Sequence, residues 1–367
     1  MKGAVISLGS VSSKWVAEAM RKYFDEVDEV QLKEIEVDVG KDGINVLYRD
    51  KPLNDYDCIY AKGSFRYTEM LRSISSALAK KCFMPIAPSA FSIGQDKLLT
   101  QLRMQQHAVP TPTTYLAATA EAAKAIFEKV NYPIVIKFPK GTQGKGVMFA
   151  ESYSSASSML DALTALKQPF LIQEYVETGG VDVRAIVVGN KVVGAMKRKA
   201  VEGEKRSNIH AGGTGEPFDL DNHSKKIAVR AAEAIGAGIC GIDMLESAKG
   251  PLVLEVNLSP GLQGITKATK MDIADKIAKW LYETTKSRKK VEQIYGASNV
   301  LEELGIQGTS KAASQSKEIL TNLDFRGNRI LLPEVINDIA DFSEKHEVSV
   351  KVKKGEVIIR KFGEMKK

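Results

Sequence analysis

The sequence predicts an α/β (α+β) protein that ends in a small β-rich appendage, and three observations support this prediction. Strand-like and helix-like patterns alternate over the first 90 residues, which is typical of an open α/β layer. Beyond residue 92, strand patterns dominate and a glycine-rich segment separates two of them. Residues 305–316 are rich in Gly, Ser, Ala, Gln and Thr, as in a flexible linker. We therefore expect two folded domains before the linker and a small module after it.

The first domain is expected over residues 1–91. Its first strand begins in the apolar N-terminus, and the helix after it is expected to be capped by Ser12 or Ser13. One face of that helix should be apolar, formed by Trp15, Val16, Ala19, Met20 and Phe24. The remaining patterns predict strands on both sides of the turn at 41–43, a strand at 57–62 and a helix at 68–81.

The second domain is expected over residues 92–285. Its helix patterns cover residues 95–107, 121–130, 224–235 and 271–284. Its strand patterns cover residues 133–138, 147–150, 170–173, 183–188, 191–196, 239–246 and 252–257. We assign residues 286–317 to a linker that begins with a basic run, and residues 318–367 to the C-terminal module.

Composition excludes several classes of protein. Of the 367 residues, 44% are hydrophobic and 26% are charged, which is ordinary for a globular protein and excludes a disordered or coiled-coil chain. No apolar run approaches 18 residues and the N-terminus lacks the long apolar segment of a signal peptide, so we expect neither a membrane span nor secretion. Three scattered cysteines and four histidines without metal-ligand spacing predict a reducing, cytoplasmic location and no zinc site. The net charge of +7 mildly favours an anionic partner.

A strand, a glycine-rich segment (residues 141–146) and a second strand form the first candidate binding motif. Glycines let backbone N–H groups approach an anion, and the pattern is neither a P-loop nor a dinucleotide fingerprint. The order of elements favours a mobile flap over a triphosphate, with a plain hairpin turn as the alternative. Lys137 lies inside the apolar strand before the flap, where a lysine usually needs an anion. Lys97 is a second candidate phosphate contact, with a solvated helix lysine as the alternative.

Asp243, Glu255 and Asn257 form the strongest local signal. Glu255 and Asn257 point to one face of an apolar strand, and Asp243 lies on the strand before it. If the intervening loop is odd in length and centred on Lys249, Asp243 faces Glu255, whereas an even loop would place them on opposite faces. Oxygen ligands of this kind suit Mg²⁺ that is held together with nucleotide phosphates. The alternative, two buried carboxylates without partners, is costly.

Two basic segments and one acidic segment complete the candidate site. Arg198 and Arg206 are suited to clamp carboxylates or phosphates, with a solvated loop face as the alternative. Residues 173–176 end one strand and Asp182 opens the next, which makes them candidates for an adenine and ribose site, with a solvated loop as the more ordinary interpretation. His210 lies beside the second basic segment, where no partner for general-base chemistry is evident.

Together these residues resemble the ATP-grasp superfamily, and specifically its RimK-like α-L-glutamate ligases. The resemblance extends from about Ser92 to Glu283, over half of the chain. It rests on the ordered motifs Gln95–Lys97, Val135–Lys137, Gly141–Gly144, Gln173–Tyr175, Asp182–Arg184, Arg206–Asn208, Gly241–Asp243 and Leu254–Gly261. The flap and the Arg206–Asn208 segment are most similar to the RimK-like branch. The resemblance implies an ATP-grasp fold.

The resemblance also implies an ATP- and Mg²⁺-dependent carboxylate–amine ligase, with Mn²⁺ as a substitute metal. A substrate carboxylate would attack the γ-phosphate of ATP, and the amine of glutamate would then displace phosphate from the acylphosphate. ATP binding is implied for Lys97, Lys137, Gly141, Thr142, Gln143, Gly144, Gln173, Glu174, Tyr175, Val176, Asp182, Arg206, Ser207 and Asn208. Metal binding is implied for Asp243, Glu255 and Asn257, and a catalytic role in neutralising the transferred phosphoryl group for Arg198, Arg206 and Asn208.

The acceptor is the least constrained part of this expectation. The strand end at residues 60–67 departs from the RimK pattern, although Lys62 and Arg66 suit a carboxylated acceptor. The leading hypothesis is addition of glutamate to the C-terminus of a protein. The alternatives are glutamylation of a deazaflavin or pterin coenzyme tail, and an amino-acid biosynthetic ligase that uses a carrier protein.

The C-terminal module resembles an AbrB-like swapped-hairpin domain over about 40 residues. Such modules usually dimerise and often bind DNA, so the resemblance implies a homo-oligomer. Residues 351–367 hold seven Lys or Arg and two Glu, which makes them a candidate contact for a ribosome or nucleic acid, with a solvated basic tail as the alternative. A hypothesis from a different class is a nucleic-acid- or ribosome-binding regulator whose ligase domain only senses ATP.

Overall fold

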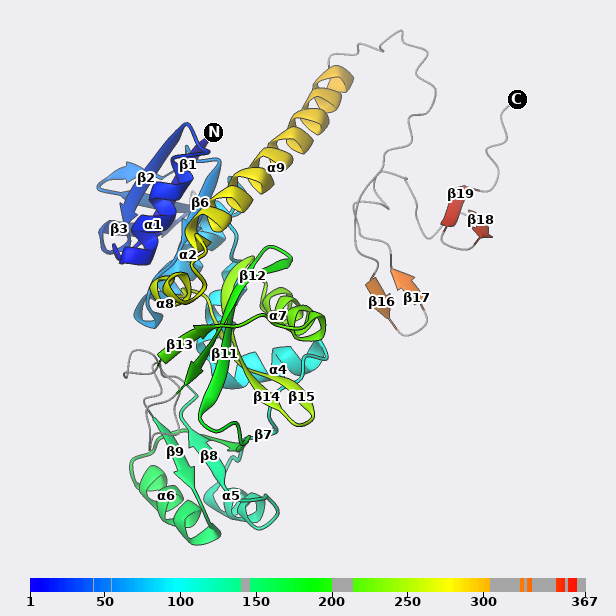
Figure 1. Cartoon of the computed structure of the whole chain (residues 1–367). Helices are drawn as coiled ribbons and strands as arrows, with labels where there is room; N and C mark the ends of the chain where they lie inside the picture. The colour runs from blue at the N-terminus through cyan, green and yellow to red at the C-terminus, as the bar shows by residue number, and fades with distance from the viewer. Residues whose placement is uncertain are drawn as a thin grey trace. The chain divides into compact units, whose positions relative to one another are not determined.

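The computed structural model describes residues 1–41, 43–53, 55–139, 146–199, 214–303, 324–326, 329–331, 348–353 and 356–361. The chain divides into two compact units, Met1–Asn299 and Val300–Lys367. The first unit contains a parallel sheet, a small antiparallel sheet and two larger antiparallel sheets, which Figure 1 shows one after another along the unit. Within the described residues, no helix is long and apolar enough to cross a bilayer.

The N-terminal domain is an open α/β layer. Its parallel sheet has the order β2-β1-β6, and its small antiparallel sheet has the order β3-β4-β5. The strands are β1 (Lys2–Ser7), β2 (Glu26–Gln31), β3 (Ile35–Gly40), β4 (Gly43–Tyr48), β5 (Lys51–Pro52) and β6 (Cys58–Ala61). The helices are α1 (Val11–Met20), α2 (Thr68–Leu78) and the short 3-10 turns η1 (Leu32–Glu34) and η2 (Phe65–Tyr67).

The N-cap of α1 is Ser10, so the expectation of Ser12 or Ser13 was wrong. Ser10 has an extended backbone, and its side chain accepts a hydrogen bond from the Ser13 N–H group. Ser12 and Ser13 instead lie buried in the first turn. Trp15 is 38% exposed and therefore does not belong to the buried face of the helix, which Val16 helps to form.

A break at Asp96 divides the single helix that the sequence pattern predicts at residues 95–107. Helix α3 (Pro88–Gln95) ends before this residue and α4 (Lys97–Gln106) begins after it. The Asp96 carboxylate accepts hydrogen bonds from the N–H groups of the second and third residues of α4, at 2.9 and 3.1 Å. Asp96 is therefore the N-cap of α4, and Lys97 occupies the first helical position.

The two larger antiparallel sheets follow. A four-stranded sheet has the order β7-β10-β8-β9 and a five-stranded sheet has the order β13-β12-β11-β14-β15. The first consists of β7 (Thr114–Tyr115), β8 (Ile134–Lys137), β9 (Val147–Ala150) and β10 (Leu171–Glu174). The second consists of β11 (Val181–Val188), β12 (Lys191–Lys199), β13 (Thr214–Pro217), β14 (Ile239–Ser247) and β15 (Gly250–Asn257).

Helices cover both sheets. They are α5 (Ala120–Phe127) and α6 (Tyr153–Ala165) on the four-stranded sheet, and α7 (Asn222–Ile235) and α8 (Gln263–Thr269) at the five-stranded sheet. The sequence patterns miss β13, α8 and α6. Helix α6 begins in a serine-rich segment with a weak apolar pattern, where Ser152 and Ser155 form a reciprocal capping box.

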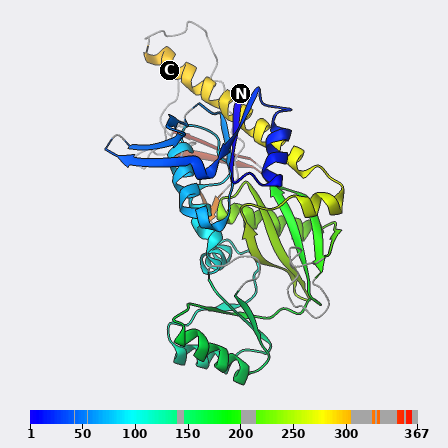
Figure 2. The same ribbon diagram turned by 90° about the vertical axis from the view of Figure 1, so that its left-hand side faces the viewer.

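The buried side chains form two hydrophobic cores. One core joins the parallel sheet, the five-stranded sheet and the helices around them. The other lies only between the four-stranded sheet and its two helices. The four-stranded sheet is therefore a separate lobe, as Figure 2 also shows at the lower end of the unit.

Helix α9 (Ile273–Glu303) is longer than the helix expected at 271–284, and it continues through the first part of the segment assigned to the linker. Its first turns pack into the larger core, and Trp280 contacts Phe83 edge-on with ring centroids 5.7 Å apart. Lys289 then pairs with Asp57 at 2.6 Å. These contacts fix the start of α9 to the N-terminal domain (Figure 1).

The second unit contains two described hairpins. They are β16 (Asp324–Arg326) with β17 (Arg329–Leu331), and β18 (Val348–Lys353) with β19 (Glu356–Lys361). The second hairpin carries Val348, Val350 and Val352 on one face, and each of them is at least 43% exposed. Both described hairpins lie within residues 318–367.

Candidate functional site

Lys137 is buried at the end of an inner strand of the four-stranded sheet. It is the last residue of β8 and is only 4% exposed. Its ammonium donates a hydrogen bond of 2.8 Å to the Gln173 side-chain oxygen, and the Gln173 amide donates in turn to the Thr114 hydroxyl at 2.7 Å. Burial lowers the pKa of Lys137 to about 8, with a further contribution from Lys97. A buried lysine that pairs with a neutral amide retains its capacity to bind an anion.

Lys97 approaches the same place from another element. Its backbone N–H donates to the Pro139 carbonyl at 3.0 Å, which joins the start of α4 to the segment that precedes the flap. Burial lowers the pKa of Lys97, while the nearby Glu255 opposes this shift. The two lysines that the sequence analysis selected are therefore near neighbours, one from a strand and one from a helix N-terminus.

Asp243 and Glu255 lie directly opposite each other on β14 and β15. The expectation that this requires an odd loop was wrong, because Ser247 pairs with Gly250 and encloses a two-residue turn. A β-bulge corrects the register: Met244 pairs with Val253 and Asp243 with Glu255, so β15 has one extra residue there. The bulge, and not the length of the loop, brings the two carboxylates together.

Two arginines contact the Asp243 carboxylate. Arg184, its partner on β11, donates from Nε to Oδ1 at 2.7 Å and from Nη2 to Oδ2 at 2.6 Å. Arg198 on β12 lies with Nη2 2.8 Å from Oδ2 of Asp243 and also binds Asp182 through two nitrogens at 2.6 and 2.5 Å. These four side chains form one ion-pair network on one face of the five-stranded sheet.

The pKa values of the Asp243 and Glu255 carboxyl groups are shifted in opposite directions. Burial raises the pKa of Asp243, but Arg184 and Arg198 together lower it to about 2. The Glu255 carboxyl is surrounded by protein atoms yet accessible to solvent, and its pKa is raised by desolvation and by the charge of Asp243. Asp243 is therefore a fixed anion, whereas Glu255 gains most from an added cation.

The donor set fits a magnesium ion in its chemistry. A carboxylate has about four lone-pair positions, and the arginines occupy three on Asp243, which leaves one on Oδ1. Asn257 is on the same strand as Glu255, two residues further, and its amide oxygen accepts a hydrogen bond from Ser259 N–H at 2.9 Å. No trio of His, Cys, Asp or Glu in the described residues is arranged for a metal, so this candidate set needs the Asn257 amide.

The remaining candidates fall into two groups. Gln173 supports Lys137, and Asp182 supports Arg198, so both have structural partners besides their expected nucleotide contacts. Tyr175 packs edge-on against Phe149 with ring centroids 5.9 Å apart, next to Glu174, which ends β10, and Val176. Outside the described residues lie Gly141, Thr142, Gln143, Gly144, Arg206, Ser207, Asn208 and His210.

Arg184 belongs to the motif Asp182–Arg184 but is not among the site residues predicted from the sequence. The available signal was the spacing: Asp182 and Arg184 are two residues apart in an apolar strand, so they share a face. Their partners on the neighbouring strands, Arg198 and Asp243, depend on register and are not visible in the sequence.

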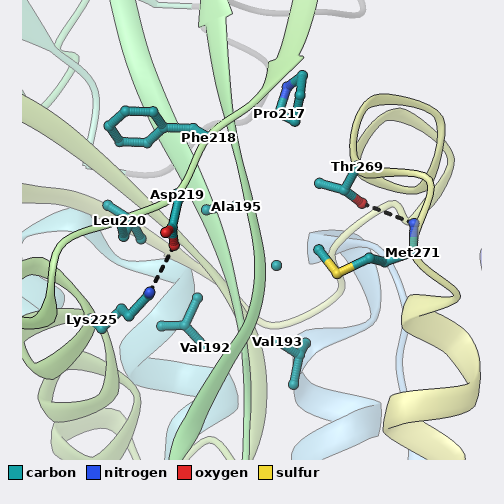
Figure 3. Close-up of a pocket in the computed structure, with 11 residues that line it drawn as sticks. Val192, Val193, Ala195, Pro217, Phe218, Asp219, Leu220, Lys225, Thr269 and Met271 are labelled. Atoms are coloured by element: carbon teal, nitrogen blue, oxygen red, sulfur yellow. Dashed lines mark hydrogen bonds and ion pairs between the residues drawn. The ribbon is translucent and has the colours of Figure 1, made fainter.

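A cavity of about 370 Å³ lies elsewhere in the unit, against β12 and the end of α8 (Figure 3). Figure 3 shows the ion pair of Asp219 with Lys225 on one side of the cavity and Thr269 beside Met271 on the other. The Lys225 Nζ and Asp219 Oδ1 atoms are 2.8 Å apart. None of the candidate site residues lines this cavity among the described residues. The charge network and not the cavity therefore marks the candidate active site.

Comparisons with known proteins agree on one family. The RimK-like ATP-grasp domain matches residues 94–281. A protein of Marinomonas sp. (strain MWYL1) named "Probable alpha-L-glutamate ligase" is 37% identical over 292 residues, which cover 77% of this chain and 96% of the relative.

Two solved structures show the same fold. The ATP-grasp ligase PsnB, complexed with a phosphomimetic variant of a minimal precursor, Mg and ADP, superposes with a TM-score of 0.61 at 19% identity, covering 77% of this chain and 98% of that one. The RimK domain protein ATP-grasp from Sphaerobacter thermophilus DSM 20745 superposes with a TM-score of 0.58 at 20% identity, covering 76% and 99%.

The fold and the matches together define an ATP-grasp ligase. The chain belongs to the RimK-like ATP-grasp family, among the α-L-glutamate ligases.

Proposed function

We propose that this enzyme joins the amine of L-glutamate to an acceptor carboxylate, and that the acceptor is the C-terminus of a protein. One observation carries the proposal: the charges of two sheets meet at one place. Lys137 from the four-stranded sheet and Lys97 from α4 are close enough to Glu255 on the five-stranded sheet to influence its pKa. The two lysines that would bind phosphates therefore lie near a carboxylate that would bind Mg²⁺, and phosphoryl transfer needs both kinds of group in one place.

The reaction has two steps. A carboxylate oxygen of the acceptor attacks the γ-phosphorus of ATP, the bond to the β-phosphate oxygen breaks, and ADP leaves. The amine nitrogen of glutamate then attacks the acyl carbon, phosphate leaves, and the nitrogen releases a proton as the amide forms. Phosphoryl transfer depends mostly on positioning and charge neutralisation, so no covalent enzyme nucleophile is needed.

We assign the residues as follows. Lys97 and Lys137 bind the phosphates, because the buried ammonium of Lys137 donates to a neutral amide and Lys97 is its cationic neighbour. Mg²⁺, held by Asp243, Glu255 and Asn257, would supply positive charge between the phosphate oxygens. Adenine and ribose binding is assigned to Glu174, Tyr175, Val176 and Asp182, and phosphoryl neutralisation to Arg198, Arg206 and Asn208, with Ser207 and the flap residues around the triphosphate.

The test is to incubate the protein with ATP, Mg²⁺, glutamate and a cell extract, and to search by mass spectrometry for species heavier by whole glutamyl units. We expect modified protein C-termini, with ADP formed in equal amount. Glu255→Gln should abolish both signals, whereas Glu246→Gln on the same hairpin, which is exposed and pairs with Lys197, should not. Persistent turnover in the Glu255 variant would refute the metal assignment.

The same experiment distinguishes the alternative acceptors. Glutamyl units in the small-molecule fraction would assign the enzyme to a deazaflavin or pterin tail, and units on one carrier protein would assign it to biosynthesis. ATP binding without any product, combined with nucleic-acid binding that is lost when residues 286–367 are removed, would support the regulator hypothesis instead.

A further inference from the structure

Lys62 occupies a special position in the N-terminal parallel sheet. The chain passes from β1 to β2 on one side of β1 and later returns to form β6 on its other side, so the strand order reverses at the boundary between β1 and β6. In open α/β sheets, ligands bind outside the carboxyl ends of the strands at such a point. Lys62 directly follows β6, and its backbone N–H donates to the Ile6 carbonyl near the end of β1 at 2.9 Å.

The ammonium of Lys62 is buried and has no counter-ion among the residues that the structure describes. The residue is 3% exposed, and the hydrogen bond that its Nζ makes within the described part of the chain goes to the Pro260 carbonyl at 3.3 Å. The Tyr60 ring lies 5.8 Å away. Burial alone lowers the pKa of Lys62 to about 8, since no carboxylate of the described residues acts on it. A buried ammonium with one long hydrogen bond is costly, and an anionic ligand would remove that cost.

The group that Lys62 contacts belongs to the segment that follows the candidate metal ligands. Pro260 comes three residues after Asn257, and both pack against Gly241, at whose position a Cβ atom would lie 3.2 Å from Pro260 and 3.7 Å from Asn257. The next residues of this segment bind the start of α1: Ser12 Oγ accepts from Leu262 N–H at 2.8 Å. Ser12 lies in the first turn of α1, so the N-terminus of this helix, which carries partial positive charge, contacts the same segment as Lys62.

We propose that Lys62 binds a carboxylate group of a substrate, at the boundary between the N-terminal sheet and the metal-binding strand. This inference rests on the proposed function, in which both the donor amino acid and the acceptor bring carboxylates. In this arrangement the N-terminal domain supplies a cation beside the segment that follows the candidate metal ligands.

The test compares Lys62→Met, Lys62→Arg and the control Lys14→Met, which removes an exposed lysine from α1. Each protein, with Mg²⁺ and ADP bound, is titrated calorimetrically with L-glutamate and with the dipeptide Ala-Glu as a model acceptor. We expect Lys62→Met to bind one of these carboxylates about 10- to 100-fold more weakly, as for loss of a charged hydrogen bond. Lys62→Arg and Lys14→Met should retain the affinity, and ADP binding should not change.

The two titrations identify the source of the carboxylate. A loss confined to glutamate assigns Lys62 to the donor, and a loss confined to the dipeptide assigns it to the acceptor. The melting temperature without substrate provides a structural control, because replacing an unpaired buried charge by an apolar side chain of similar length is expected to keep or raise it.

The proposal is overturned if Lys62→Met binds both carboxylates as tightly as the wild type, or if the wild type binds neither. Lower melting temperatures for both Lys62 variants with unchanged affinities would show that Lys62 only ties β6 to Pro260. Failure of the proposed function has a different signature, because a wild type that binds glutamate but forms no glutamyl product would refute the ligase reaction and not the carboxylate site.

Discussion

At the scale of single residues, Asp243 and Glu255 show how neighbouring carboxylates acquire different properties. Asp243 is 6% exposed and is bound by two guanidinium groups, whereas Glu255 is accessible and has no ion pair within the described residues. Removing the charge of Asp243 leaves Arg184 and Arg198 partly unpaired. Removing the charge of Glu255 instead relieves repulsion from Asp243.

The two carboxylates should therefore respond differently to neutral substitution. We expect Asp243→Asn to lower the free energy of unfolding by about 3–5 kcal/mol, as when one partner of a buried pair is removed. Glu255→Gln should leave it unchanged or higher at pH 7, although both variants should lose turnover by more than about 100-fold. Denaturant melts and an ADP-release assay measure the two effects, and equal stability losses would contradict this account.

Lys137 predicts a proton uptake on nucleotide binding. Its pKa of about 8 in the free protein should rise when a triphosphate lies beside it, because the anion favours the charged form. At pH 8.5 the group is largely neutral before binding and charged after it, whereas at pH 7 it is mostly charged in both states. Calorimetry of ATP binding in buffers of different ionisation enthalpy should show uptake at pH 8.5 that is smaller in Lys137→Met. Identical uptake in both proteins would exclude Lys137 as its source.

At the scale of secondary-structure elements, the cap of α4 links stability to the site. Asp96 fixes the first turn, and the first residue of that turn is Lys97. The N-cap of α7, Asp221, accepts a hydrogen bond from Ser224 N–H at 2.8 Å and provides a matched comparison in a helix that carries no candidate ligand.

We expect Asp96→Ala and Asp221→Ala each to lower the free energy of unfolding by about 1 kcal/mol, the usual value of an N-cap. Only Asp96→Ala should also raise the KM for ATP, because it displaces Lys97, and Asp96→Ser should restore both values. Chemical denaturation and steady-state kinetics check these expectations. A similar KM change in the Asp221 variant would show that the effect is general loosening of the fold.

The elements also show how far the sequence determines the fold and the site. The alternation of patterns and the motif Glu255-Val256-Asn257 predict the strands and the shared face of Glu255 and Asn257, because side-chain direction alternates along a strand. The pairing of Asp243 with Glu255 was predicted from the wrong loop length. A bulge leaves no mark in an apolar strand, since Val253 and Leu254 are equally suited to either position. The ion pairs of Arg184 and Arg198 likewise depend on strand neighbours that lie far apart in the sequence.

At the scale of the whole molecule, the first unit corresponds in length to a complete relative. The Marinomonas protein is covered to 96% by an alignment of 292 residues, and the first compact unit contains residues 1–299. Its larger core includes the first turns of α9, so the helix start belongs to the ligase and not to the appendage.

A chain that ends at Asn299 should therefore keep its melting temperature and its turnover on small acceptors. Ending the chain before Arg288 should lower the melting temperature, because the ion pair of Lys289 with Asp57 and the cation–π contact of Arg288 with Phe83 are lost. Calorimetry and the ADP-release assay compare the three lengths. Inactivity of the chain that ends at Asn299 would assign a catalytic contribution to the second unit.

The bulge on β15 also has a practical consequence for protein engineering. The extra residue of β15 lies between the turn and the two carboxylates. The strand pairing at the tip of the β14–β15 hairpin therefore has a different register from the pairing of Asp243 with Glu255. Its two turn residues, Ala248 and Lys249, lie at the end of the hairpin away from Asp243, and Lys249 is exposed. We expect that a fluorophore or a short peptide tag inserted there would report on the enzyme without moving the candidate site residues Asp243 and Glu255.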